Sequence, residues 1–167
     1  NSAVCGSTSA PSNYFVINLD EYTGGTDDSS TLPCAANNYL ASTDTLWIRR
    51  VNEVQPVTMD LNRIYLQSSR VQGTLFVPTA GCTNPGDTAC IPADYLPPAS
   101  QSRELEARVY YVSSQSTNRN DVPALRRKRF ANANGSAGAA FVDEEIVPGV
   151  ENLQVRFGVD TTGASNV

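Results

Sequence analysis

The side chains that could carry out acid–base chemistry in this sequence are carboxylates, because the chain contains no histidine. Histidine is the most frequent general base and is required for a Ser-His-Asp triad. Adjacent residues of a strand point to opposite faces, so neighbouring carboxylates do not form the facing pair of a glycosidase. We therefore expect solvated acidic surface and no catalytic residue, and we do not expect an enzyme. The clusters in question are Asp20-Glu21, Asp27-Asp28 and Asp143-Glu144-Glu145.

Motifs that bind cofactors or metals are also missing from the sequence. There is no GxSxG, P-loop or GxGxxG motif. The segment TGGTDD, residues 23–28, has two glycines but lacks the lysine and the following helix of a phosphate cradle, which favours a flexible turn. Without histidine or a CxxC pair, a zinc site of the usual kind has no ligands. We expect no cofactor and no metal.

The four cysteines indicate disulfide bonds and an oxidising compartment. The tight turn in CTNPGDTAC favours a Cys82–Cys90 bridge, which leaves Cys5–Cys34 as the second. Free buried thiols in a cytosolic protein are the alternative.

The run RRKRF, residues 126–130, is the one concentrated charge feature. In a strand, Arg126 and Lys128 face one way and Arg127 and Arg129 the other, which argues against a buried central strand. One interpretation is an edge strand that its charges protect against unwanted pairing. The other is a docking surface for an acidic partner.

Alternating apolar residues predict a mainly antiparallel β protein, and no segment has a sustained helical period. In ELEARVYYVSS, Leu105, Ala107, Val109 and Tyr111 share one face. Near the end, GVENLQVRFGVD predicts a closing strand whose Leu153, Val155, Phe157 and Val159 face the core. Other predicted strands lie in residues 44–51, 62–69, 73–77, 122–130 and 139–147, the last two joined by a hairpin loop.

Length and charge limit the class of protein. The 167 residues fit one domain, with a loop region at 1–43 and a proline-rich loop at 78–98 that a disulfide would close. A net charge of −5 argues against nucleic acid and anionic membranes as partners. No apolar stretch approaches the ~20 residues of a spanning helix, and no signal peptide opens the sequence. We expect the soluble part of a longer protein.

The order of these segments resembles the PilW-type minor pilins of type IV pilus assembly. The specific pieces are VPALRRKR, residues 122–129, and GVENLQVRFGVD, residues 149–160, within a similarity over about residues 42–163. The resemblance implies an α+β, pilin-like fold: an antiparallel β head on an N-terminal hydrophobic helix, which is absent from these residues. Calcium-binding residues of many members are not matched after Gly163, and the family's further strand is missing.

A structural protein is what the resemblance implies. Minor pilins of this type are anchored in the inner membrane with a periplasmic head and then join the pilus tip, where they prime growth and support twitching motility and adhesion. Expected partners are other minor pilins, the major pilin and a tip adhesin, with membrane contact only through the helix. Alternatives are a type II secretion pseudopilin of the J type, a carboxylate hydrolase, or an extracellular carbohydrate-binding domain that uses Trp47, Tyr65 or Tyr110.

Overall fold

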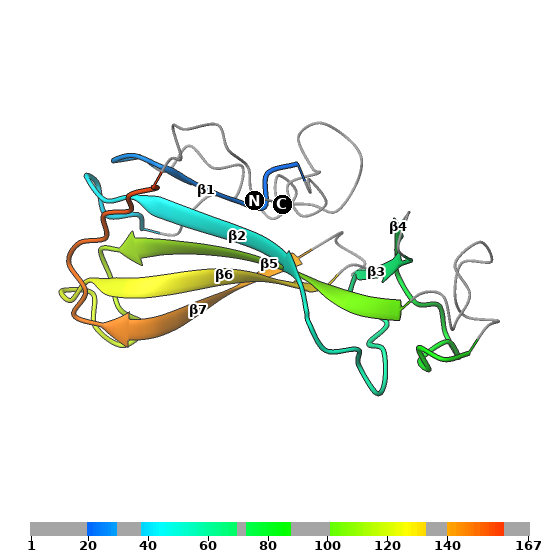
Figure 1. The fold of residues 1–167 in the computed structure, drawn as a ribbon. Coiled ribbons are helices and arrows are strands. Elements are labelled where there is room, and N and C mark those ends of the chain that lie inside the picture. The colour runs from blue at the N-terminus through cyan, green and yellow to red at the C-terminus, as the bar shows by residue number, and fades with distance from the viewer. Residues whose placement is uncertain (1–19, 30–37, 70–72, 88–100, 133–139, 159–167) are drawn as a thin grey trace.

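The described part of the protein is an antiparallel β-sheet without helices (Figure 1). The computed structural model describes residues 20–29, 38–69, 73–87, 101–132 and 140–158. Among these residues, no helix has the length and hydrophobicity needed to cross a membrane. The strands are β1 (Thr23–Thr26), β2 (Thr45–Val51), β3 (Tyr65–Ser68), β4 (Gly73–Phe76), β5 (Gln101–Ser113), β6 (Ala124–Asn132) and β7 (Ala140–Pro148). The predicted antiparallel architecture is confirmed.

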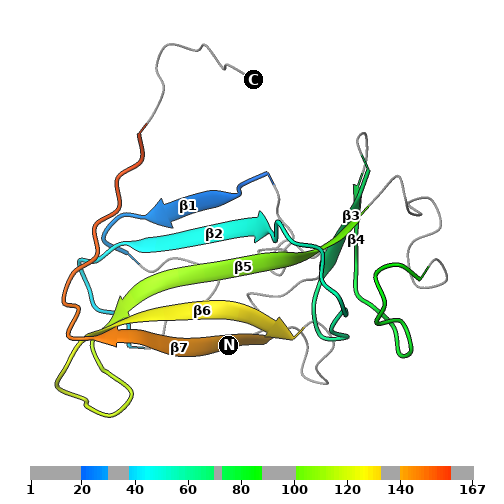
Figure 2. The same ribbon diagram turned by 60° about the horizontal axis from the view of Figure 1, so that its bottom comes forward.

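The sheet is organised around β5, the longest of these strands. On one side β5 pairs with β2, whose other neighbour is β1. On the opposite side β5 pairs with β3 near its start and with β6 near its end. Figure 2 shows the result. The strands β1, β2, β5, β6 and β7 form one broad layer, and β3 and β4 lie beside the start of β5.

The inner face of the sheet carries the apolar core. The predicted alternation along β5 is confirmed, since Leu105, Ala107, Val109 and Tyr111 are each at most 2% exposed. Phe130 of β6 lies opposite Phe141 of β7. Their rings pack edge to face, with the ring centroids 5.6 Å apart. Alternate side chains of a strand share a face, so burial of every second residue fixes which side of the sheet faces inward.

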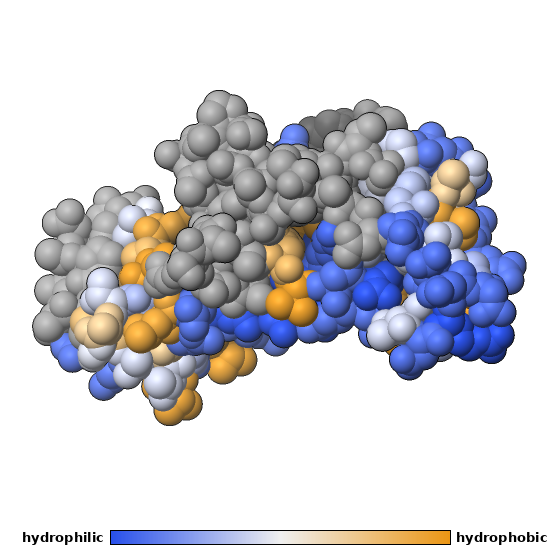
Figure 3. Space-filling model, turned by 180° about the vertical axis from the view of Figure 1, so that it is seen from behind, coloured by the Kyte–Doolittle hydropathy of each residue, from blue (hydrophilic) through white to orange (hydrophobic). Residues whose placement is uncertain are grey.

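The prediction that β6 is an edge strand is wrong. β6 pairs with β5 along one side and with β7 along the other, so RRKRF lies inside the sheet. In the described part of the chain the strands with a neighbour on one side only are β1, β4 and β7. Seen from behind, the end of the molecule near β3 and β4 carries most of the hydrophobic residues, and the opposite end is mainly hydrophilic (Figure 3).

The prediction of a flexible turn at TGGTDD is also wrong, because its first four residues form β1. Gly24 is the cross-strand partner of Trp47. A Cβ atom at Gly24 would lie 2.4 Å from Cζ2 of Trp47, so the absence of a side chain lets the indole ring cover this strand. A strand made of small residues thus forms within residues 1–43, the region predicted to consist of loops around at most one short element.

The predicted closing strand at residues 153–159 does not form. Residues 151–158 contain no strand, and Phe157 is 53% exposed where we expected a core residue. Leu153 and Val155 are half-buried, and Val159 lies outside the described residues. The segment leaves β7 at Gly149 and passes the ends of the strands towards β1 (Figure 2), so it has no ladder to join.

The carboxylate of Asp44 holds this segment in place. Asp44 is only 3% exposed, and its two oxygens accept hydrogen bonds from the backbone amides of Asp28 (3.0 Å) and Val155 (2.6 Å). Its own amide donates to the carbonyl of Leu153 at 2.9 Å. These amide donors stabilise the charged form and lower the pKa of Asp44. One side chain therefore ties together the end of β1, the start of β2 and the segment after β7.

Two predicted loops are consistent with the structure as far as it describes them. The part of the proline-rich loop at 78–87 contains no strand, and residues 88–98 lie outside the described residues. Cys82 is not a free thiol. Cys5, Cys34 and Cys90 lie outside the described residues, as does the loop between β6 and β7, so the disulfide pairing stays a prediction.

We predict that Val109→Ala destabilises the fold by about 2 kcal/mol, because it removes buried methyl groups from the centre of β5. The matched control is Val57→Ala, since Val57 is 93% exposed and Val109 only 2%. Urea denaturation followed by circular dichroism measures both. Equal effects of the two substitutions would contradict the assignment of the inner face.

Candidate functional site

The basic run of β6 lies directly against the acidic cluster of β7. We predicted that Asp143, Glu144 and Glu145 are solvated surface, and this is wrong: their side chains are 15%, 28% and 18% exposed. The register aligns opposite charges across the two strands, which is favourable. The aligned pairs are Arg126 with Glu145, Arg127 with Glu144, and Lys128 with Asp143.

On the inner face, Asp143 is the centre of a partly buried polar cluster. It accepts hydrogen bonds from the Tyr111 hydroxyl at 2.5 Å and from Nε of Arg126 at 2.7 Å. Nζ of Lys128 lies 3.9 Å from the same carboxylate. Charges removed from water are tolerated when they are paired and hydrogen-bonded, and Asp143 meets both conditions.

Lys128 is the only lysine in the sequence. Its side chain is 13% exposed, and burial lowers the pKa of Lys128 while nearby Asp143 opposes that shift. Arginine does not respond in this way, because its guanidinium keeps its charge. The inner cluster thus combines one titratable cation with one permanent cation.

The opposite face of the sheet, which we call the outer face, carries a row of arginines and glutamates. Glu144 accepts from Nη2 of Arg127 at 2.7 Å and from Nε of Arg129 at 2.6 Å. Hydrogen bonds from these two guanidiniums lower the pKa of Glu144. The charged residues that define the outer face are Arg50, Glu106, Arg108, Arg127, Arg129 and Glu144.

A second glutamate of the outer face is shared in the same way. Glu106 of β5 lies 2.8 Å from Nε of Arg50 on β2 and 3.1 Å from Nη2 of Arg108. Each glutamate is therefore bridged by two arginines. The four arginine side chains stay accessible, at 56%, 31%, 30% and 33% exposure for Arg50, Arg108, Arg127 and Arg129.

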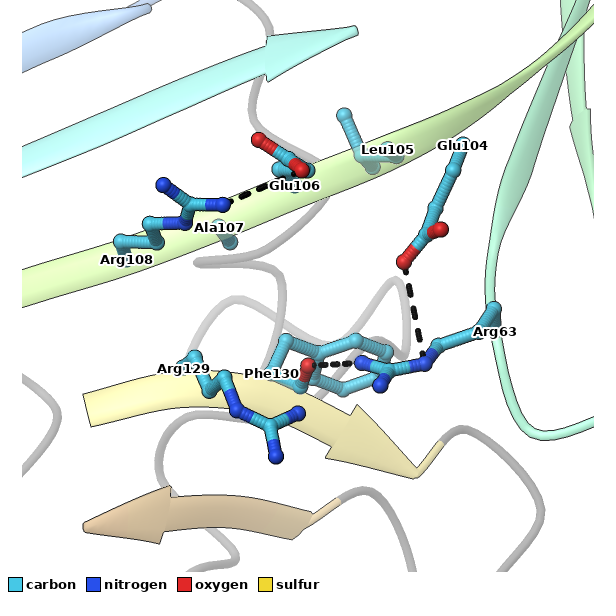
Figure 4. A pocket seen from close by; sticks show the side chains of 8 residues that line it. All are labelled: Arg63, Glu104, Leu105, Glu106, Ala107, Arg108, Arg129 and Phe130. Carbon is cyan, nitrogen blue, oxygen red and sulfur yellow. Dashed lines mark hydrogen bonds and ion pairs between the residues drawn. The ribbon is translucent and has the colours of Figure 1, made fainter. Parts of the chain in front are cut away.

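Two hollows open among these residues. One, of about 290 Å³, lies over β2 and β5 and is lined by Ile48, Arg50, Glu106, Arg108 and Tyr110. The other, of about 190 Å³, lies where β5 passes from β6 to β3 (Figure 4). Its lining residues are Arg63, Glu104, Leu105, Glu106, Ala107, Arg108, Arg129 and Phe130.

The structure separates the four basic residues that we predicted as one docking surface. Arg126 and Lys128 lie on the inner face, where Asp143 and Glu145 engage them. Only Arg127 and Arg129 belong to the outer face. The sequence reasoning missed the two other arginines, Arg50 and Arg108, because they come from β2 and β5. The signal that could have found them is a basic residue in each predicted strand on its polar side.

The aromatic residues considered for sugar stacking do not form a common platform. Tyr65 is 1% exposed, and its hydroxyl accepts a hydrogen bond from the amide of Asp60. Trp47 packs against Gly24 on the inner face, while Tyr110 lies on the outer face. These three side chains therefore cannot stack on one sugar chain.

Three carboxylates gather near the end of β1. Oxygens of Asp27, Asp28 and Asp44 lie within 4.8 Å of one another. The Asp44 carboxylate already accepts two backbone amides, as described above. The Asp44 member of the cluster thus serves to join backbone segments.

A comparison with known families finds one match in the second half of the chain. The family model described as Type IV Pilus-assembly protein W matches residues 109–167. The PilW resemblance is confirmed over this segment. The match associates the protein with type IV pilus assembly, which implies protein partners in the pilus system and a place at the cell envelope. No curated protein and no solved structure matches the chain.

The PilW match includes the end of β5 and the whole β6–β7 pair. Both charged clusters centred on Asp143 and Glu144 therefore lie in the matched segment. Arg50, Glu106 and Arg108 of the outer face lie before it.

We predict that Asp143→Asn destabilises the protein by about 3 kcal/mol, because it leaves Arg126 and Lys128 partly buried without their shared counter-charge. Asp121→Asn is the control: it disrupts the ion pair of Asp121 with Arg119, whose side chains are 73% and 65% exposed. We expect that control to change stability by less than about 0.5 kcal/mol. Chemical denaturation at neutral pH gives both values, and similar losses would contradict a central role for Asp143.

We also predict that Glu144 contributes to the loss of stability in acid. A carboxyl group with a lowered pKa in the folded state stabilises the fold above its unfolded pKa, and this contribution disappears as the pH falls through the folded pKa. Between about pH 5 and about pH 3, Glu144→Gln should therefore lose less stability than the unmodified protein, although it starts lower. Melting temperatures across this range measure the difference.

The control for Glu144→Gln is Glu151→Gln, at an exposed position after β7. It should leave the acid dependence of the melting temperature unchanged. Parallel acid profiles for Glu144→Gln and the unmodified protein would show that the Arg127 and Arg129 pairs do not stabilise the ionised form.

Proposed function

We propose that this protein is a minor pilin whose β-sheet forms the head of the subunit. In this proposal the fold is pilin-like, with the sheet carried on a hydrophobic N-terminal helix that anchors the protein in the inner membrane before assembly. The head then joins the complex at the pilus tip that primes growth. The observation that carries the proposal is the PilW match over residues 109–167, which includes the end of β5 and the whole β6–β7 pair.

We further propose that the protein works by contact and not by catalysis. Glu106 and Glu144 are each bridged by two arginines, and Asp143 is bound by Tyr111 and Arg126. Hydrogen bonds from two arginines lower the pKa of Glu144 and make it a poor proton donor, which does not suit the general acid of a glycosidase. Accessible arginines on a sheet face instead suit protein–protein contact, where arginine is enriched.

The proposal predicts that deletion of the gene strongly reduces the number of surface pili and impairs twitching motility. Complementation with the intact gene should restore both. Pili sheared from the cell surface and probed for the major pilin measure the effect, and antibody labelling of whole pili tests the tip location. Normal piliation of the deletion strain would contradict the role in assembly.

Type II secretion in the same deletion strain provides the control for the pseudopilin alternative. We expect secreted enzymes to appear in the medium at normal levels. Loss of secretion with intact pili would assign the protein to the secretion system instead.

A further inference from the structure

The charges of the outer face alternate across the sheet, with one interruption. In spatial order the residues are Arg50, Glu106, Arg108, Arg129, Glu144 and Arg127. Each glutamate has an arginine on both sides, at 2.6–3.1 Å. Between Arg108 and Arg129 the alternation fails, because these two arginines are direct cross-strand partners on β5 and β6.

Two like charges in directly opposite positions of a sheet are unfavourable. Among the described residues, no carboxylate is paired with both Arg108 and Arg129: Arg108 is paired with Glu106, and Arg129 with Glu144. The row from Arg50 to Arg127 therefore carries four arginines against two glutamates, although the whole chain has a net charge of −5. This excess positive charge is local and lies on an accessible surface. Glu104, on the same face of β5, lies near Arg63.

The hollow of about 190 Å³ is lined by both of these arginines. Figure 4 shows that the Arg108 guanidinium turns towards Glu106, while that of Arg129 turns away from β5 and towards β7. The third arginine of the lining, Arg63, is held by the Phe130 carbonyl at 2.6 Å and lies 3.7 Å from Glu104. A volume of ~30 Å³ holds one water, so the hollow has room for a carboxylate group.

We propose that a carboxylate side chain from an acidic segment of a partner protein binds between Arg108 and Arg129 and completes the alternation. Glu106 and Glu144 show on this same face how one carboxylate is shared by two arginines. The planar guanidinium can form two parallel hydrogen bonds to a carboxylate, which favours this partner over a diffuse anionic surface. The inference deepens the proposed contact function. It rests on that function only for the statement that the partner is a pilus subunit.

The test measures binding of a fluorescein-labelled peptide of alternating Thr and Glu to the 167-residue chain by fluorescence anisotropy. The same peptide with Gln for Glu tests the need for carboxylates, and a heparin oligosaccharide tests an anionic glycan. The variant is Arg108→Gln/Arg129→Gln. Its matched control is Arg119→Gln/Arg156→Gln, which removes the same charge from exposed positions elsewhere.

We expect the Glu peptide to bind, and both the Gln peptide and the Arg108→Gln/Arg129→Gln variant to weaken binding by about ten-fold. The control variant should change the dissociation constant by less than about two-fold. The double variant removes a like-charge pair but also the ion pairs of Arg108 with Glu106 and of Arg129 with Glu144, so its melting temperature is measured beside that of the control variant. If the double variant unfolds, the single variants Arg108→Gln and Arg129→Gln replace it in the test. Each should lose part of the affinity for the Glu peptide.

Equal losses for the two double variants would overturn the proposal, because net charge alone would then explain binding. Failure of the Glu peptide to bind, or binding of heparin in preference to it, would overturn it as well. These results do not depend on the deletion strain. Normal piliation would contradict the pilus role and leave the carboxylate site standing, so the two failures can be distinguished.

Discussion

The pairing of the basic β6 with the acidic β7 is the interaction on which the arrangement of this sheet depends. Asp143 and Glu144 are adjacent in sequence, yet they serve opposite faces, and each finds cations of β6 on its own side. A shift of the register by one residue would move each carboxylate to the other face and separate it from its partners. The charges thus favour this alignment of β6 and β7, as burial of apolar residues favours that of β5. Because carboxylates of β7 pair with its cations, β6 can occupy an internal position in the sheet although it carries four consecutive basic residues.

The sequence was sufficient to predict the features that depend on one strand alone. The alternation from Leu105 to Tyr111 predicted the buried face of β5, because a period of two assigns side chains to faces. The same period in Leu153, Val155 and Phe157 predicted a strand that does not form. Periodicity describes which side chains share a face, and it contains no information on whether a neighbouring strand is present to pair with.

The candidate site also depends on strand pairing that the sequence of a single strand does not reveal. Arg127 and Arg129 could be identified from the run in which they occur, whereas Arg50 and Arg108 join them only through the pairing of β2, β5 and β6. The hairpin predicted for residues 122–130 and 139–147 placed the basic run beside the acidic cluster, but the register that aligns Arg127 with Glu144 and Lys128 with Asp143 was not apparent from the sequence. β1 was missed because Gly24 and Gly25 resemble a turn, and the ring of Trp47 that covers Gly24 comes from another strand. For Arg50, Arg108 and β1 the missing information is a contact between segments that are distant in the sequence.

The hydrogen bonds of Asp44 to the segment after β7 determine how the sheet would respond to a mechanical force. A pull applied beyond residue 158 reaches the sheet first at Val155 and Leu153, whose hydrogen bonds to Asp44 join them to the start of β2. Force therefore enters near the middle of the broad layer and not at β7, the strand from which the segment departs. The hydrogen bonds between β7 and β6 would otherwise break one after another, so a single buried carboxylate protects the β7 edge of the sheet from sequential unpairing.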